Sequence, residues 1–254
     1  MTEVNQTLQG VDTPAVDSLK PKVKTRIACW NVRTLYQTGK FAQVVREFHN
    51  YGLDILGVCE TRWTESGQRT LASGHTILYS GRLNGHHTEG VALIMSRKME
   101  RTLIEWKPLG SRLLKARFNS KYTKLTVIVC YAPIEDAEEA DKDAFYDQLQ
   151  AVTDEVPTPD LLMVLGDLNA RPGNNNIGRD RVMGKHGIGT INDNGERLCH
   201  FCDKNNMVIG GTLFQHRDIH KTTWTSPSEA TKSQIDHILI NGKWRDLQRS
   251  RCRQ

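Results

Sequence analysis

The chain has 254 residues, of which 25% are charged, and its formal net charge is +5. This length suits one larger α/β domain or two small ones, and the mild basicity is compatible with a polyanionic partner without proving one. No apolar run approaches the roughly 18 residues that span a bilayer, and the N-terminus carries no apolar signal-peptide core. We therefore expect neither membrane insertion nor secretion.

The six cysteines indicate a reducing compartment, nuclear or cytoplasmic. Three of them lie inside apolar strand-like runs, where a thiol behaves as a small hydrophobic group. Cys199 and Cys202 have the spacing of a metal-binding pair, but no second pair follows and a structural zinc site needs four ligands. Because they share a helical stripe with Leu198 and Phe201, we expect them to be core residues.

Residues 1–24 are polar and show no hydrophobic period, which predicts a disordered leader before a domain over 25–254. Apolar stretches bounded by turn residues predict strands along that domain. In chain order these are 26–31, 53–59, 75–80, 90–96, 113–118, 125–131, 161–167, 208–209, 222–225 and 234–240. Helical spacing of apolar residues predicts helices over 41–51, 145–152 and 194–202, the last with Asn194 as its N-cap.

Polar side chains stand at the ends of several predicted strands. In chain order they are Asn31, Glu60, Tyr131, Asp167 and Asn169, with Asp236 inside a later strand. Because strand side chains alternate, Asp167 and Asn169 should point to the same side of the backbone. A carboxylate at the mouth of an apolar strand is costly unless it is paired, hydrogen-bonded or near a metal. Taken alone, Gly166 to Asn169 also fits an ordinary turn.

Several such endings suggest one polar pocket at a common sheet edge, the place where open α/β sheets hold their sites. Carboxylate and amide oxygens suit a hard cation such as Mg²⁺. Five arginines lie near these residues in the sequence, three of them in the long loop after the predicted strand 161–167. Guanidinium groups match the geometry of phosphate. The arginines are Arg33, Arg62, Arg171, Arg179 and Arg181. This combination predicts metal-assisted phosphodiester chemistry.

Six short strings, all in family order, resemble the endonuclease/exonuclease/phosphatase superfamily, which has the DNase-I-like fold of apurinic endonucleases. They are Cys29–Arg33, Cys59–Trp63, Tyr131–Pro133, Gly166–Ala170, Thr223–Trp224 and Gln234–Leu239. The Arg62-Trp63 pair and the segment 187–202, with its Asn192-Asp193-Asn194-Gly195 motif, look closest to endonuclease domains of LINE-type retrotransposons. Craniofacial-development-protein-like domains, derived from these, are equally similar.

This resemblance implies an α/β (α+β) fold, a two-sheet β-sandwich flanked by helices, and Mg²⁺-dependent hydrolysis of DNA, with Mn²⁺ as an alternative ion. Glu60 would be the principal metal ligand, with Asn31 beside it. Asp167, steadied by Asn169, would deprotonate the attacking water, and Tyr131 would donate to the phosphate. Asp236 would orient a catalytic histidine. The residues near DNA would be Arg33, Arg62, Trp63, Arg171 and Thr223.

The sequence departs from the family after residue 240, because the Ser-Asp-His strand that supplies the catalytic histidine is not found. His237 follows Asp236 directly and should face the opposite side of its strand. We therefore expect a domain that is C-terminally truncated by one strand and that hydrolyses DNA more slowly than its relatives. Two alternatives stay open. One is a non-catalytic remnant that binds nucleic acid or protein, and the other is the same fold acting on RNA or on a small phosphodiester or phosphate ester.

Overall fold

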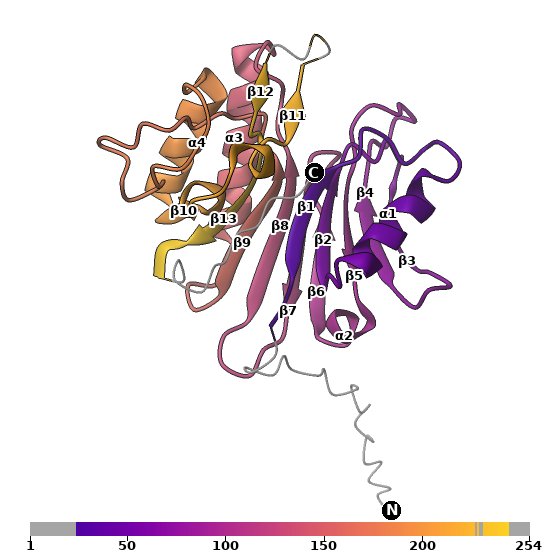
Figure 1. Cartoon of the computed structure of the whole chain (residues 1–254). Helices are drawn as coiled ribbons and strands as arrows, with labels where there is room; N and C mark the ends of the chain where they lie inside the picture. The colour runs from indigo at the N-terminus through magenta and orange to yellow at the C-terminus, as the bar shows by residue number, and fades with distance from the viewer. Residues whose placement is uncertain (1–23, 227, 229–230, 244–254) are drawn as a thin grey trace, which may run out of the picture.

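The computed structural model describes residues 24–226, 228 and 231–243. The leader expected over 1–24 lies outside the described residues except for Lys24, as do the basic residues after Lys243. Eleven of the described strands form two mixed β-sheets packed face to face, with helices on the outer faces, and two short strands form a separate pair (Figure 1).

The first sheet has five strands in the order β1-β2-β5-β4-β3. They are β1 (Ile27–Asn31), β2 (Ile55–Cys59), β3 (Ser66–Thr70), β4 (Thr76–Ser80) and β5 (Val91–Met95). β1 and β2 are parallel and the other neighbours are antiparallel. The helix α1 (Lys40–Asn50) joins β1 to β2 and packs Val44 and Phe48 on the outer face. β3 was not predicted, because its side chains are mostly exposed and no apolar run marks it.

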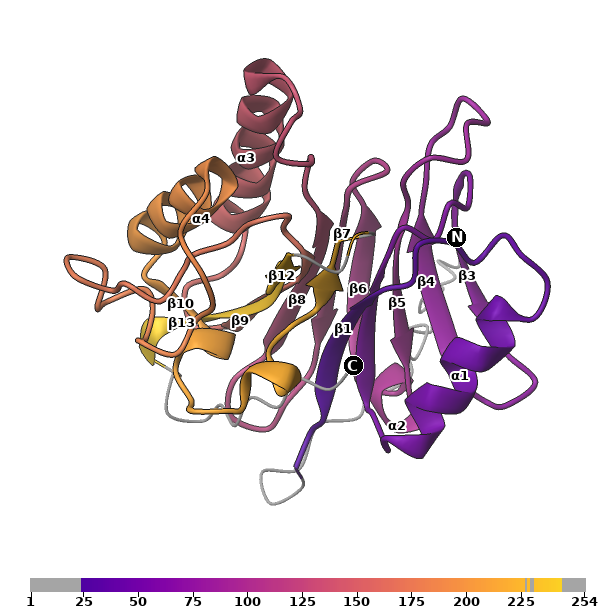
Figure 2. The ribbon, with the colours of Figure 1, turned by 45° about the horizontal axis from the view of Figure 1, so that its top comes forward.

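The second sheet has six strands in the order β10-β13-β9-β8-β7-β6. They are β6 (Leu103–Pro108), β7 (Leu113–Phe118), β8 (Leu125–Tyr131), β9 (Leu161–Asp167), β10 (Met207–Ile209) and β13 (Asp236–Asn241). Two helices, α3 (Glu139–Asp154) and α4 (Asp193–Lys204), lie side by side over its outer face (Figure 2). The short elements are α2 (Arg97–Glu100), β11 (Trp224–Thr225), β12 (Lys232–Ser233) and two 3-10 turns, Gly210–Thr212 and Asp218–His220.

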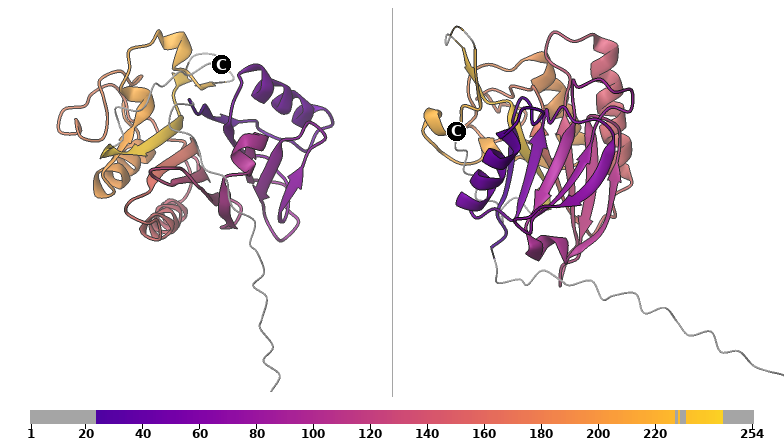
Figure 3. Two further views of the ribbon diagram at one scale, coloured as in Figure 1. Left: turned by 90° about the horizontal axis from the view of Figure 1, so that it is seen from below. Right: turned by 90° about the vertical axis from the view of Figure 1, so that its right-hand side faces the viewer.

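Three apolar cores hold the four layers together, and the layers are seen from below in Figure 3. The central core lies between the sheets, where Leu165 of β9 meets Val129 of β8 and residues of β2 and β5. Cys199 and Cys202 belong to the core under α3 and α4, as their helical stripe predicted. Burial raises the pKa of both thiols, which keeps them protonated.

The start of α4 corrects one expectation. The N-cap is Asn192, whose Oδ1 accepts a hydrogen bond from the Gly195 N–H at 2.9 Å. Asn194 lies inside the helix and is completely buried. Both residues fit a capping role by type, so the sequence alone could not choose between them.

Within the described residues, no helix is both long and apolar enough to span a membrane.

The topology brings five strand ends to one edge of the molecule. β1 and β2 are parallel, as are β8 and β9, so in each sheet their carboxyl ends meet. β13 runs antiparallel to β9, and its first residue, Asp236, pairs with Asp167, the last residue of β9. Asp236 is therefore at the beginning of its strand rather than inside it. It still reaches the common edge because the direction of the strand is reversed.

Gly166 precedes Asp167 with a φ of +150°, and a Cβ there would lie 1.9 Å from the carbonyl oxygen of Cys130. We predict that Gly166→Ala lowers the free energy of unfolding by about 2–4 kcal/mol, because it adds both a clash with fixed backbone and a strained φ. Gly178→Ala is the matched control, since Gly178 has a φ of +73° and nothing within 4 Å. The control should lose only about 1 kcal/mol in urea unfolding. Equal losses would contradict the close approach.

Candidate active site

The amide of Asn31 is the centre of the site. Its Nδ2 donates to Glu60 Oε1 at 2.8 Å and to Asp167 Oδ2 at 2.7 Å, while its Oδ1 accepts from the Arg33 N–H at 2.8 Å. Because carboxylates only accept and a backbone N–H only donates, these partners fix the orientation of the amide. Asn31 and Glu60 belong to the first sheet and Asp167 to the second, so one amide joins the two sheets.

Glu60 follows β2 directly and its side chain is 17% exposed. It accepts a hydrogen bond from the Tyr131 hydroxyl, and Arg62 Nη2 lies 3.5 Å from its Oε2. Burial, followed by the negative charges of Glu60 and Asp167, raises the pKa of Tyr131 far above its ordinary value. The phenol therefore keeps its proton at neutral pH and can act as a donor.

Asp167 is buried at the end of β9. Burial raises its pKa to about 6, against the lowering effect of hydrogen bonds from Asn31 and Asn169, and the charge of Glu60 raises it further. Asn169 has a φ of +47°, so it lies beyond the end of β9 with a left-handed backbone conformation and not on a strand. Its N–H donates to Asp167 Oδ1 at 2.9 Å. The two residues are neighbours as predicted, but strand alternation was the wrong reason.

Asp236 stands across from Asp167 at the start of β13. Burial and the charge of Asp167 raise its pKa well above the ordinary range, although hydrogen bonds from the Thr223 hydroxyl and the Asn31 backbone oppose this. Its Oδ1 is inaccessible to solvent and has no hydrogen-bond partner within the described residues. Thr223 Oγ1 also accepts from the N–H groups of Ile235 and Asp236. The contacts of Thr223 therefore serve Asp236, and its predicted place beside DNA stays a prediction.

Three acidic side chains, Glu60, Asp167 and Asp236, lie at this edge. The charge of Glu60 raises the pKa of Asp167, and the charges of Asp167 and Glu60 raise the pKa of Asp236, so the three groups repel one another. A divalent cation would relieve that repulsion, and carboxylate oxygens are its preferred ligands. Within residues 24–226, 228 and 231–243, no group of three His, Cys, Asp or Glu is arranged to hold a metal ion. Mg²⁺ commonly binds through one or two carboxylates and keeps several waters, so Glu60 fits this mode of binding. The Oδ1 of Asn31 is already engaged, and its role as a ligand stays a prediction.

The backbone around the site is strained. Non-glycine residues with positive φ include Arg33 (59°), Glu60 (55°), Arg62 (56°) and Asn169 (47°). Each such residue costs roughly 1 kcal/mol or more, and strain of this kind is concentrated at functional sites. Glu60 is itself one of the carboxylates bonded by Asn31, and the other three lie within two residues of Asn31, Glu60 or Asp167, which supports a functional role for this edge.

The predicted DNA-contacting residues differ in how the structure places them. Arg33 and Arg62 are exposed beside Asn31 and Glu60. Trp63 is half-buried and packs edge-on between Phe41 and Tyr79, with ring centroids 5.3 Å away in both cases, so it supports α1 instead of standing open. Arg171 is half-buried, and its N–H donates to Asn192 Oδ1 at 2.7 Å.

Arg179, another of the arginines expected to bind phosphate, pairs instead with Glu196 of α4. Its Nη2 lies 2.7 Å from each carboxylate oxygen of Glu196. Its charge is therefore partly neutralised within the fold. Of the five arginines expected near the site, Arg33 and Arg62 are exposed and lie within two residues of Asn31 and Glu60.

The sequence did not reveal the role of Glu89. Its buried carboxylate accepts from Arg82 Nε at 2.8 Å and from Arg112 Nη2 at 2.8 Å, and it also accepts from Ser111. Burial opposes ionisation, but these partners lower its pKa overall. Arg112 in turn donates to the Tyr131 carbonyl at 3.1 Å and stands over the Tyr131 ring. A lone Glu before an apolar strand gives no sequence signal for such a contact.

A family profile for the endonuclease/exonuclease/phosphatase family matches residues 28–253. The chain belongs to this family. Asn31, Glu60, Tyr131, Asp167 and Asp236, which the resemblance had named as site residues, meet at one edge of the fold of this family member.

Several known proteins resemble the chain in sequence or in fold. It is 36% identical over 239 residues to craniofacial development protein 2 of Tragulus javanicus, an alignment that covers 91% of this chain and 41% of the relative. The chain thus spans about two fifths of the length of the curated relatives it matches.

The fold is that of two solved nucleases. The endonuclease domain of TRAS1, a telomere-specific non-LTR retrotransposon, superposes with a TM-score of 0.59 at 14% identity, over 88% of either chain. An AP endonuclease from Leishmania major gives a TM-score of 0.62 at 12% identity, over 91% of this chain and 86% of that one. The expected two-sheet sandwich flanked by helices is confirmed.

We predict that Asp167→Asn stabilises the metal-free protein at pH 7, because the neutral amide avoids burying a charge beside Glu60. The folded-state pKa of Asp167, about 6, exceeds its ordinary value of 3.8, so the folded protein binds more protons between these values and loses stability as the pH rises. In thermal unfolding with EDTA, the free energy of unfolding of the variant should exceed that of the wild type above pH 6, by up to about 3 kcal/mol. The difference should shrink towards pH 4. A wild type that is more stable at pH 7 would contradict this.

Proposed function

We propose that this chain is a metal-dependent endonuclease domain that hydrolyses phosphodiester bonds of DNA. The single observation that carries the proposal is the double hydrogen bond of Asn31 Nδ2 to Glu60 and Asp167, which holds a half-buried and a buried carboxylate at the meeting point of the two sheets. Tyr131 and Asp236 lie at the same point. A family that acts on phosphate esters is consistent with such a site.

In this proposal, Asp167 is the general base. It takes a proton from a water molecule whose oxygen attacks phosphorus, and the bond from phosphorus to the leaving oxygen breaks. A pKa of about 6 suits this role, because the group is ionised at neutral pH yet remains basic. The Tyr131 hydroxyl donates a hydrogen bond to the phosphoryl oxygen as negative charge develops there. A divalent cation held by Glu60 supplies, when bound, polarisation of the phosphate and stabilisation of the leaving oxygen.

DNA is favoured as substrate by two observations. Arg33 and Arg62 are exposed next to the acidic cluster, where they can contact phosphates on either side of the bond that is cleaved. Both nucleases with a similar fold are named for activity on nucleic acid, one as a retrotransposon endonuclease and one as an AP endonuclease.

A second candidate is binding of nucleic acid without cleavage. It is favoured by the unpartnered Oδ1 of Asp236, the atom that would orient a catalytic histidine in the family. Salt-dependent DNA binding with no cleavage in Mg²⁺ would select this candidate.

We predict that the chain nicks supercoiled plasmid in Mg²⁺ and that Glu60→Ala and Asp167→Asn each lower the rate by about 10²–10⁴-fold, as expected for loss of the metal ligand or of the base. Asp203→Asn, on the exposed side of α4, is the matched control and should keep the wild-type rate. Nicking that survives both active-site changes would refute the proposed function.

We predict that Arg33→Ala weakens DNA binding and lowers the slope of log affinity against log salt by about 0.9, the value for one lost phosphate contact on duplex DNA. Arg46→Ala is the control, because Arg46 has a side chain that is 69% exposed on α1 and pairs with Glu47. Fluorescence anisotropy at several salt concentrations gives both slopes. Identical slopes for the two variants would remove Arg33 from the binding surface.

A further inference from the structure

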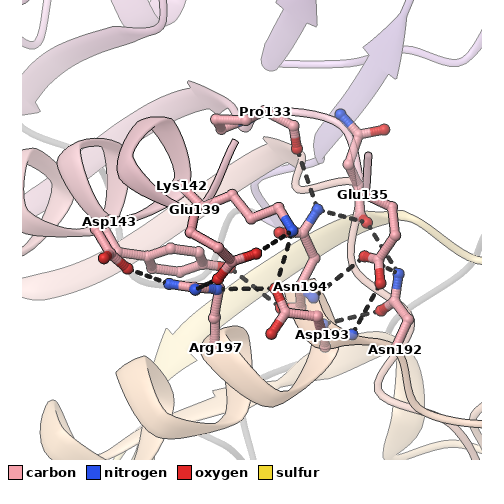
Figure 4. A network of polar contacts seen from close by, with 12 residues as sticks. Pro133, Glu135, Glu139, Lys142, Asp143, Asn192, Asp193, Asn194 and Arg197 are labelled. Carbon is pink, nitrogen blue, oxygen red and sulfur yellow. Dashed lines mark hydrogen bonds and ion pairs between the residues drawn. The ribbon is translucent and has the colours of Figure 1, made fainter. Parts of the chain in front are cut away.

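The first turn of α4 lies beside the segment that follows β8, where Pro133 and Glu135 are found (Figure 4). Asn194, in that turn, is fully buried, and its Nδ2 donates to the Pro133 carbonyl at 3.1 Å and to the Asn169 carbonyl at 3.2 Å. Pro133 is two residues after Tyr131, and Asn169 is two residues after Asp167. One side-chain amide therefore joins the segment that carries the phosphate donor to the segment that carries the base.

The position of Asn194 is itself fixed by Glu135. This carboxylate accepts from the N–H groups of Asp193 at 2.9 Å and Asn194 at 3.2 Å, and from Asn192 Nδ2 at 2.6 Å. Negative charge is favourable at the start of a helix, so Glu135 holds the end of α4 firmly. The chain from Tyr131 to Glu135 thus grips the helix, and the helix grips the chain after Asp167.

Asn192 adds a second tie to the same segment. Its Oδ1 accepts from the Arg171 N–H at 2.7 Å as well as from Gly195, and its own N–H donates to the Arg171 carbonyl at 3.1 Å. The two asparagines of the Asn-Asp-Asn-Gly motif therefore serve the segment 169–171, one through Asn169 and the other through Arg171.

Asn194 is a costly choice for helix stability. Its Oδ1 is buried without a hydrogen-bond partner among the described residues, and a buried unpaired polar atom costs about 1–3 kcal/mol. Leucine has nearly the same shape, has a better helix propensity and would bury no polar atom. The value of the amide must therefore lie in its two donated hydrogen bonds.

α4 has separate anchors to α3. Towards α3, Arg197 donates to Asp143 at 2.5 Å and to Glu139, and the buried Lys142 of α3 donates to Asp193 at 3.1 Å, while within α4 Arg197 also donates to Asp193 at 2.9 Å (Figure 4). These ion pairs attach the helix to its neighbour without touching either active-site segment. They provide a control in which α4 is loosened while the bridge made by Asn194 remains.

We propose that Asn194 is a positioning residue that, together with the parallel pairing of Tyr131 with Asp167, fixes the separation between the Tyr131 hydroxyl and the Asp167 carboxylate. The inference rests on the proposed function for its kinetic consequence, but its structural consequence does not. Asn194 touches no reacting atom. It acts through the carbonyl groups of Pro133 and Asn169, and small displacements of catalytic groups reduce turnover more than they reduce binding.

The test compares Asn194→Leu with Arg197→Met in the full chain. Both variants should have a melting temperature equal to or below that of the wild type. Only Asn194→Leu should lower kcat for plasmid nicking, by about 10- to 100-fold, with KM unchanged within about twofold. Asn194→Ser, whose hydroxyl can donate one hydrogen bond, should give an intermediate kcat and also serves if leucine does not fold. Equal kcat values for Asn194→Leu and wild type would overturn the inference.

Hydrogen exchange measured by mass spectrometry separates this inference from the proposed function. Asn194→Leu should speed exchange in peptides covering 131–135 and 167–171, whereas Arg197→Met should speed it in α3 and α4 alone. If the wild type does not cleave DNA but these exchange patterns appear, the proposed function fails and the positioning role stands. Unchanged exchange at 131–135 and 167–171 would overturn the positioning role whether or not the chain cleaves DNA.

Discussion

The structure depends on one side-chain amide that satisfies two carboxylates from different sheets. Without the N–H groups of Asn31, Glu60 and Asp167 would face each other as negative charges at a largely dry edge, where repulsion is strong. With it, both acids are held in place and Asp167 keeps a pKa near 6 instead of a higher one. At this edge, the polar contact between the two sheets and the assembly of the acidic cluster therefore depend on the same side chain.

The surrounding fold stabilises this arrangement although several residues of the site have strained backbone conformations. Glycine at 166 lets β9 pass close to the carbonyl of Cys130 just before Asp167. The Glu89 carboxylate holds Arg112 against the Tyr131 ring, and the Glu89 backbone carbonyl accepts a hydrogen bond from the Arg62 N–H at 2.7 Å. The strained residues Glu60, Arg62 and Asn169 are stable only because packed segments on either side leave them no alternative. A site of this kind is built from the second layer of contacts as much as from the groups that do chemistry.

The sequence predicted most of the strands and the identity of the cluster, because apolar runs that end in Asn, Glu, Tyr and Asp are visible without coordinates. It failed where direction or a turn decides geometry. Asp236 reaches the site because β13 is antiparallel, and Asn169 does so through a left-handed backbone conformation after β9. The packing of the Trp63 ring between two aromatic side chains was not foreseen, and its contact with DNA stays a prediction. Glu89 and Glu135 act through partners that are distant in sequence, and no local pattern marks them.

The most direct test of the central claim is the titration of the Asp167 carboxyl group by carbon-detected NMR in metal-free protein, for the wild type and for Asn31→Leu. The structure predicts a pKa of about 6 in the wild type and a higher value in the variant, because the variant removes the hydrogen bond that favours the charged form while keeping the site dry. An ordinary pKa near 3.8 that does not change in Asn31→Leu would show that Asp167 is neither buried beside Glu60 nor held by Asn31.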